Sequence, residues 1–179
     1  MAIIRELNGI MPKIGKNCFI AENAAIIGDV EIGDDCSIWY GVVLRGDVNK
    51  IIIRNRVNVQ DNATIHTTYQ KSITVLDDDV SVGHNAVIHG ARVGKGSLIG
   101  MGSVLLDNAE IAPGTVIAAG AVVLARSVLE QGIYAGIPAK MVKEGSDEVT
   151  ALAGHNAKQY MMYKDWYKDT DQILSEPEK

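Results

Sequence analysis

Aliphatic residues recur at every sixth position along most of this chain. One frame runs from residue 14 to residue 44, a second covers residues 53 to 88 with a gap, and a third, displaced by one position, covers residues 93 to 123. The aliphatic positions are Ile14, Ile20, Ile26, Ile32, Ile38, Leu44, Ile53, Val59, Ile65, Val82, Ile88, Val93, Ile99, Leu105, Ile111, Ile117 and Val123. A period of six kept this long fits neither the 2.0 of a strand nor the 3.6 of a helix, so it indicates an internal structural repeat.

The repeat predicts a solenoid of short parallel strands. Each six-residue unit makes one flat side, three sides make a coil of 18 residues, and stacked coils place neighbouring strands about 4.8 Å apart. The aliphatic residue fills the interior, and the fifth position of the unit is small in most repeats, as at Ala24, Ser97 and Ala121. Gly, Asn and Asp elsewhere, as in residues 33–35 and 94–96, suit the corners.

Two interruptions break the frame. Residues 49–52 add three positions between Leu44 and Ile53, and residues 67–72 form an excursion between Ile65 and Val82. Breaks in a repeat array often map to loops on one binding face. Cys18 and Cys36 both hold the fifth position and lie 18 residues apart. That spacing permits a disulfide, but two inward cysteines in a reducing compartment are expected to be free thiols.

The pattern is expected to end after Val128. Residues 136–140 then form a turn that leaves the prism, and Ser146 precedes acidic residues as a helix N-cap does. Apolar and aromatic residues follow at helical spacing: Val149, Leu152, Ala153, Asn156, Tyr160, Tyr163 and Tyr167. We therefore predict a β-helix domain over residues 1–140. A C-terminal segment, 141–179, should hold one amphipathic helix packed on the prism to about Leu174, with a frayed tail from Ser175 to Lys179.

Composition narrows the partners. The chain of 179 residues is 47% hydrophobic but only 5% aromatic, which suits strands around a narrow interior rather than an ordinary globular core. Its net charge is -5 and it has no long basic run, so neither nucleic acid nor an anionic membrane is an expected partner. The opening residues do not resemble a signal peptide, and residues 116–125 are too short an apolar stretch to span a bilayer. A cytoplasmic protein is expected.

Three of the four histidines fall in one short window. His66 and His89 each follow a frame residue and lie 23 positions apart, which is one coil of 18 plus an excursion of five. They should therefore stack on successive coils and can share a metal ion. His84 lies one triangle side away, so around a threefold axis it could complete the site of a neighbouring subunit. His155, in the predicted helix, is interpreted as an ordinary surface residue.

The sequence resembles the gamma-class carbonic anhydrases and their bacterial homologues in the hexapeptide-repeat superfamily. The resemblance covers nearly the whole chain and rests on Arg45-Gly46-Asp47, Asn58-Val59-Gln60-Asp61-Asn62, the three histidines, and Ala91-Arg92-Val93-Gly94 after His89-Gly90. It implies a left-handed coil, which the six-residue period alone does not specify, and which departs from the right-handed rule for parallel strand crossovers.

The resemblance also implies a function and a site. The activity is hydration of carbon dioxide to bicarbonate by a homotrimer with a zinc ion (Fe²⁺ or Co²⁺ being alternatives) at each subunit interface. His66 and His89 match two ligands from one subunit, and His84 matches the ligand from the next. Gln60 matches a residue that hydrogen-bonds the reacting water or bicarbonate. The other matching positions are Asn58 and Asp61 beside the site, Arg45 and Asp47 as an intersubunit ion pair, and Tyr160 pointing at the site from the helix.

The sequence departs from the family pattern at two places, and two other functions are also compatible with it. The best-known family members carry a Glu shortly after the residue that Asp47 matches, and a loop Glu that exports protons. Here residues 47–50 and 67–72 hold no Glu, so a slow hydratase is expected. One rival is an acyltransferase that uses coenzyme A with His89 as general base, which leaves His66 and His84 unexplained. The other is a non-catalytic metal-binding trimeric scaffold.

Overall fold

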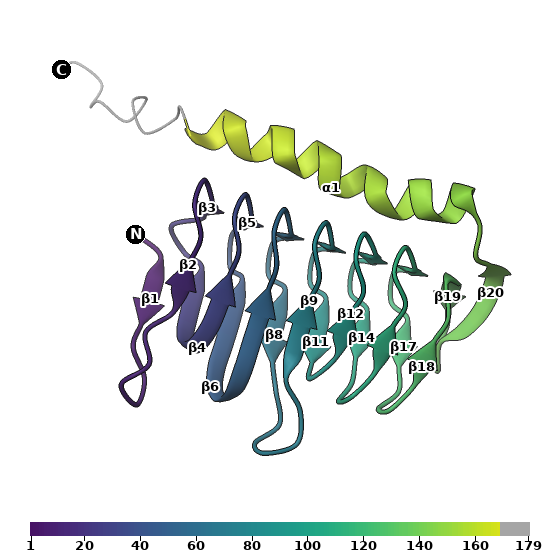
Figure 1. The fold of residues 1–179 in the computed structure, drawn as a ribbon, viewed down its shortest axis with the longest axis horizontal. Coiled ribbons are helices and arrows are strands. Elements are labelled where there is room, and N and C mark those ends of the chain that lie inside the picture. Colours follow the sequence, from purple (N-terminus) through teal and green to yellow (C-terminus); the bar gives the residue numbers. More distant parts are fainter. Residues whose placement is uncertain (169–179) are drawn as a thin grey trace.

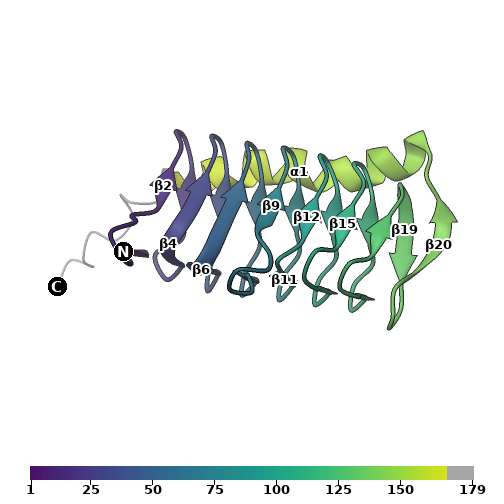
Figure 2. The same ribbon diagram turned by 60° about the horizontal axis from the view of Figure 1, so that its bottom comes forward.

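The computed structural model describes residues 1–168 as a left-handed, triangular β-helix with one long helix along its side (Figure 1). The expected helix end at Leu174 and the expected frayed tail from Ser175 lie outside the described residues. Figure 2, turned by 60°, shows the strands stacked coil upon coil, with α1 (Asp147–Lys168) behind them. The all-β solenoid that the six-residue period predicts is thus confirmed, together with its terminal helix.

Three faces make up the prism, and parallel strands stack along each. Face 1 consists of β1 (Ile3–Arg5), the first part of β4 (Ala25–Ile32) and of β6 (Val43–Ile53), β8 (Thr64–His66), β11 (Val87–His89), β14 (Val104–Leu105) and β17 (Val122–Val123). Face 2 consists of β2 (Lys13–Ile14), the second part of β4 and β6, β9 (Thr74–Leu76), β12 (Arg92–Val93), β15 (Glu110–Ile111) and β18 (Val128–Leu129). Face 3 consists of β3 (Phe19–Ile20), β5 (Ser37–Ile38), β7 (Asn58–Val59), β10 (Ser81–Val82), β13 (Leu98–Ile99), β16 (Val116–Ile117) and β19 (Gly132–Ala135), and β20 (Lys140–Glu144) pairs antiparallel to β19.

The interior is the predicted column of frame residues. Ile26, Leu44, Ile65, Ile88 and Leu105 lie one above another on face 1, and all are fully buried. The small fifth positions are buried beside them, because three strands that meet around a narrow axis leave little volume at each corner. The corners also match the prediction: Asp35 and Gly96 adopt φ of 60° and 66°, the left-handed region that Asn, Asp and Gly tolerate.

The coil extends beyond the predicted frame at both ends. Ile4 on β1 pairs with Ile26, so a first strand precedes the frame that begins at Ile14. At the other end the coil continues past Val128, where the aliphatic pattern ends, and stays within the β-helix domain predicted over residues 1–140. The strand β19 continues face 3, with Tyr134 paired to Ile117 and buried in the core. The aliphatic pattern did not indicate this strand because a tyrosine holds the interior position.

Both interruptions lie near the corner between faces 1 and 2. The three added residues at 49–52 are absorbed inside β6, where the pairing to β4 shifts between Gly28 and Val30. The excursion at residues 67–72 is a loop between β8 and β9, visible as the longest hanging loop in Figure 1. The side chain of Asn49 donates hydrogen bonds to the carbonyl oxygens of Thr68 and Ser72, at 2.8 and 2.9 Å. Asn49, in the first interruption, therefore holds the loop of the second interruption in place.

Helix α1 lies along face 3. Ser146 caps it as predicted, since its Oγ accepts a hydrogen bond from the Val149 backbone N–H at 3.3 Å. The buried stripe consists of Val149, Ala153, Ala157 and Lys164, with Tyr160 partly buried between them. Leu152, predicted on this stripe, is 53% exposed. It precedes Ala153 by one residue and is therefore turned about 100° away around the helix axis.

A buried lysine holds the far end of α1. The Lys164 side chain is 1% exposed, and its Nζ donates to the carbonyl oxygen of Asn17 at 3.3 Å. The ammonium also lies 3.6 Å from a carboxylate oxygen of Asp35 and 3.4 Å from one of Asp165. A buried ammonium is stabilised only when it is paired and hydrogen-bonded, so these partners explain its position. Within residues 1–168, no helix has the length and apolarity needed to cross a membrane.

Cys18 and Cys36 are free thiols, as predicted. Phe19 pairs with Ser37 on the adjacent coil, so the two cysteines are stacked neighbours. Cys36 is buried, and its Sγ donates to the Arg54 carbonyl oxygen at 2.9 Å. The contact between the two sulfurs lowers the pKa of Cys18 to about 7, whereas that same contact and burial raise the pKa of Cys36.

We therefore expect iodoacetamide to alkylate Cys18 selectively. The thiolate is the nucleophile, so the rate should rise as pH increases through about 7 and then level off. Mass spectrometry of the peptides after timed exposure measures it. The variant Cys18→Ser should show almost no labelling while it stays folded. Labelling of Cys36 before Cys18, or a rate that rises only above about pH 8.5, the range of an ordinary thiol, would contradict the assignment.

Candidate metal centre

His66 and His89 meet at the end of face 1. They close β8 and β11, and their Cα atoms are direct partners in the parallel pairing of these strands. The predicted stacking on successive coils is therefore confirmed. Nδ1 of His66 and Nε2 of His89 lie 3.2 Å apart, with ring centroids separated by 5.2 Å.

This separation fits a shared metal ion. Two nitrogens that each lie 2.0–2.1 Å from a tetrahedral ion are about 3.4 Å apart, close to the 3.2 Å observed here. Neutral imidazole is a ligand for zinc, iron and cobalt alike. The donor set thus suits a divalent transition metal and does not select one.

Each of these imidazoles has a carboxylate behind it. Nε2 of His66 lies 2.8 Å from Oδ1 of Asp47, and Nδ1 of His89 lies 3.3 Å from Oδ1 of Asp107. In both rings the nitrogen that meets the carboxylate is the one turned away from the other histidine. A carboxylate that accepts the N–H of one ring nitrogen keeps the other nitrogen unprotonated, which is the form that binds a metal.

Asp107 is a site residue that the sequence interpretation missed. It follows His89 by one coil of 18 residues and accepts hydrogen bonds from the hydroxyls of Thr68, at 2.8 Å, and Ser72. Burial tends to raise the pKa of its carboxyl, but the hydroxyl donors and His89 outweigh burial and hold that pKa below its usual value. The spacing of 18 was a usable signal, because it is the interval that stacks residues on adjacent coils.

Asp47, the carboxylate behind His66, also has partners that hold it in place. Arg45 forms an ion pair with it inside the chain, and this arginine side chain is 45% exposed. Burial would raise the pKa of Asp47, but the hydrogen bonds from His66 and Arg45 outweigh it and lower that pKa. Between the two lies Gly46, where an added Cβ would come within 2.5 Å of the Asp29 carbonyl oxygen. The Arg-Gly-Asp segment therefore needs its central glycine for coil packing.

His84 lies apart from the pair. It sits in the turn after β10, at the corner between faces 3 and 1, and its Nδ1 is 2.8 Å from Oδ2 of Asp61. Like His66 and His89, His84 therefore has a carboxylate next to one of its ring nitrogens. Within residues 1–168, no three His, Cys, Asp or Glu side chains are grouped so as to hold an ion. His155 is exposed on α1.

Gln60, Asn58 and Tyr160 belong to the His84 side of the prism. Gln60 and Asn58 are buried, and Nε2 of Gln60 donates to Oδ1 of Asn58 at 3.0 Å, while Asn58 donates to Ser81 at 2.8 Å. Gln60, His84 and Tyr160 line one pocket of about 420 Å³ between face 3 and α1. Burial, followed by the charge of Asp61, raises the pKa of Tyr160 to about 12, so its hydroxyl stays protonated at neutral pH.

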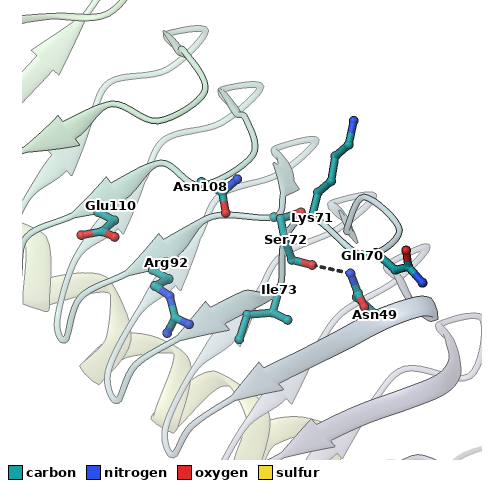
Figure 3. A pocket seen from close by; sticks show the side chains of 9 residues that line it. Asn49, Gln70, Lys71, Ser72, Ile73, Arg92, Asn108 and Glu110 are labelled. Atoms are coloured by element: carbon teal, nitrogen blue, oxygen red, sulfur yellow. Dashed lines mark hydrogen bonds between the residues drawn. The ribbon is translucent and has the colours of Figure 1, made fainter.

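A second, polar pocket of about 360 Å³ lies beside the loop at residues 67–72. Figure 3 shows Lys71 extending away from Arg92 and Glu110, which are paired neighbours on face 2. The bond from Asn49 to the Ser72 carbonyl oxygen closes one end of it (Figure 3).

Comparisons with known proteins agree with the fold and place the chain among known families. The family model described as bacterial transferase hexapeptide (six repeats) matches residues 11–46 and 90–125. Protein YrdA of Escherichia coli K12 is 42% identical over 93% of this chain and 95% of its own length. A carbonic anhydrase of Geobacillus kaustophilus is 40% identical over 95% of this chain and 93% of its own. The crystal structure of a putative acetyltransferase from Bacillus cereus superposes with a TM-score of 0.89 at 40% identity, over 93% of this chain and 97% of that one.

Proposed function

This chain belongs to the gamma-class carbonic anhydrase-like proteins of the hexapeptide-repeat superfamily, and we propose that it catalyses the reversible hydration of carbon dioxide to bicarbonate with a divalent metal, zinc in the first instance. One observation carries the proposal. The facing nitrogens of His66 and His89 lie 3.2 Å apart, and each ring has a carboxylate on its opposite nitrogen. His84, paired with Asp61 in the same manner, is the proposed third ligand, supplied by a neighbouring subunit.

The metal would supply hydroxide at neutral pH, because a three-histidine zinc site lowers the pKa of a bound water to about 7, a magnitude for which carbonic anhydrase is itself the reference case. The protein supplies orientation. Asp47, Asp107 and Asp61 hold the three imidazoles in the metal-binding tautomer. Asn58 fixes the direction of the Gln60 amide at the edge of the site, where Gln60 would orient bicarbonate by hydrogen bonding.

The three faces support a trimer with sites at its interfaces. Face 3 is covered by α1, and face 2 presents Lys13, Glu31, Arg92 and Glu110 to solvent. Face 1 has no such cover among the described residues. Its outward column in strand register is apolar except for one threonine, and every member is only half-buried: Ala25, Val43, Thr64, Val87, Val104 and Val122.

A contiguous apolar stripe beside an incomplete ligand set fits a second copy of the same chain. Cyclic symmetry would bring the His84 corner of one subunit against the His66 and His89 end of the next. Arg45 and Asp47 lie at this same end of face 1, beside the proposed seam.

We expect carbon dioxide hydration to be measurable but slow, and to accelerate with buffer concentration. Fast turnover needs a group that carries the released proton to solvent, and the loop at residues 67–72 contains no carboxylate. Stopped-flow assays over a range of buffer concentrations, with zinc and with anaerobic ferrous iron, measure this. Elemental analysis should find about one metal per chain. The triple variant His66→Ala, His84→Ala, His89→Ala should bind none.

The same experiment separates the alternatives. A fast rate that ignores buffer would mean that another group exports the proton. Acetyl transfer from acetyl coenzyme A without hydration under either metal would favour an acyltransferase, the activity named for the Bacillus cereus protein of similar structure. Bound metal with neither activity would favour a scaffold. Unchanged metal content in the triple variant would remove the histidine site altogether.

A further inference from the structure

Seven of the nine aromatic residues of this chain gather at one place, where α1 crosses the first coils of face 3. They are Phe19, Trp39, Tyr40, Tyr160, Tyr163, Trp166 and Tyr167, here called the aromatic cluster. Only Tyr69 and Tyr134 lie elsewhere. Since the rest of the prism is built from small aliphatic residues, this concentration is a feature of one site and not of the core.

The rings hold one another in place. Trp39 is the centre, with ring centroids 4.9 Å from Phe19, 5.4 Å from Tyr160 and 5.1 Å from Tyr167. The last two contacts are edge-to-face, at 80° and 89°, the arrangement that ring quadrupoles favour. Trp39 is further fixed because its indole N–H donates to Ser37 Oγ at 3.0 Å. The cluster is thus organised before any ligand arrives.

These rings line a pocket of about 260 Å³ that is open to solvent. Every member of the cluster except Phe19 lines it, and the one other lining residue is Asp61. Oδ2 of Asp61 also lies 2.8 Å from Nδ1 of His84. The pocket therefore combines aromatic walls with one negative charge.

Nothing positive lines this pocket among the described residues. Lys164 follows the lining residue Tyr163 on α1, but its ammonium is buried against Asn17, Asp35 and Asp165. Negative charge, in contrast, is felt by two of the lining tyrosines. After burial, the charge of Asp61 helps to raise the pKa of Tyr160, and that of Glu22 helps to raise the pKa of Tyr40. The electrostatic environment thus favours a cation over an anion or a neutral guest.

We propose that the aromatic cluster binds a small organic cation of the methylated ammonium class. Ring faces carry negative quadrupole charge and attract such cations, and Trp is the strongest of the three aromatic types. A quaternary ammonium has no N–H, so it needs no hydrogen-bond acceptors in a pocket whose walls are mostly rings. Asp61 supplies the counter-charge.

The test compares the affinity of choline with that of its neutral isostere 3,3-dimethylbutan-1-ol, since the two share a shape and differ in charge. The only two tryptophans, Trp39 and Trp166, both line the pocket, so intrinsic fluorescence reports on it directly. Titration at constant ionic strength should give saturable binding of choline. The isostere should bind about tenfold more weakly, which corresponds to about 1.4 kcal/mol. Calorimetry on the same samples provides a second readout.

Tyr163→Leu removes one ring of the pocket and should weaken choline severalfold, while Tyr69→Leu, an exposed tyrosine on the 67–72 loop, should leave it unchanged. The comparison of choline with its isostere on the unmodified protein stands even if Tyr163→Leu fails to fold. Equal affinity for the two ligands, or a response that never saturates, would overturn the proposal. Because neither readout involves metal or carbon dioxide, failure here leaves the proposed hydratase function untouched, and the reverse also holds.

Discussion

Co-expression of His84→Ala chains with His89→Ala chains should restore metal binding and hydration that neither variant has alone. In a cyclic trimer each site takes His84 from one subunit and His66 with His89 from the next. A mixed trimer then contains one interface that receives His84 from a His89→Ala chain and both other ligands from a His84→Ala chain. With random mixing, about a quarter of all sites are intact. Metal content and activity relative to the unmodified protein measure this fraction.

The matched control pairs His66→Ala with His89→Ala. These two ligands come from the same chain, where they face each other at 3.2 Å, so every site lacks one of them whatever the mixture. No recovery is expected. Recovery in the control, or none in the His84 mixture, would show that the assignment of ligands to subunits is wrong. A monomer in light scattering that retains its metal would exclude the shared site.

Replacing Asp107 by Ala should lower metal affinity by about 10- to 100-fold, the range seen when a carboxylate behind a histidine ligand is removed. Asp107 lies 3.3 Å from Nδ1 of His89 and also accepts from Thr68 and Ser72. Its loss frees the His89 ring to rotate and to take the tautomer that protonates the metal-facing nitrogen. It also releases the loop at residues 67–72. Competition with a chelator of known affinity, using zinc or cobalt, measures the change.

Two further variants separate positioning from stability. Asp107→Asn keeps the shape and a hydrogen-bond acceptor but removes the charge, so its metal affinity should lie between those of Asp107→Ala and the unmodified protein. Asp77→Asn, an exposed carboxylate on face 2, should leave the affinity unchanged. If Asp107→Ala bound metal normally while the protein melted earlier, Asp107 would serve the loop alone.

The histidine pair shows which contacts of a repeat fold can be predicted from sequence spacing. A spacing of 18 residues, corrected for one excursion, corresponds to adjacent coils, because every coil returns the chain to the same face about 4.8 Å further along. The pairing of His66 with His89 and of Cys18 with Cys36 could therefore be predicted by counting. The separate location of His84 followed in the same way. Handedness did not follow from counting and came from the family resemblance.

Asp107 could have been found by the same counting, since it follows His89 by 18 residues. It was missed because an acid at a corner is ordinary in such repeats. Only the structure shows that its carboxylate meets the imidazole and two hydroxyls. Side-chain direction depends on rotamers and on neighbours that the repeat does not specify.

The solenoid, its faces, its corners and the stacked pairs can all be predicted from the amino-acid sequence, since they depend on a periodicity that converts distance along the chain into distance in space. Tertiary structure alone decided the contacts between elements that share no period. It placed Lys164 against the coil that carries Asn17 and Asp35, gathered seven aromatic rings from two coils and a helix more than a hundred residues later, and left face 1 uncovered within residues 1–168. The physical reason is that the helix advances about 1.5 Å per residue along the prism whereas the β-helix advances about 4.8 Å per coil of 18 residues, so counting residues does not relate the two and packing in three dimensions sets their contacts.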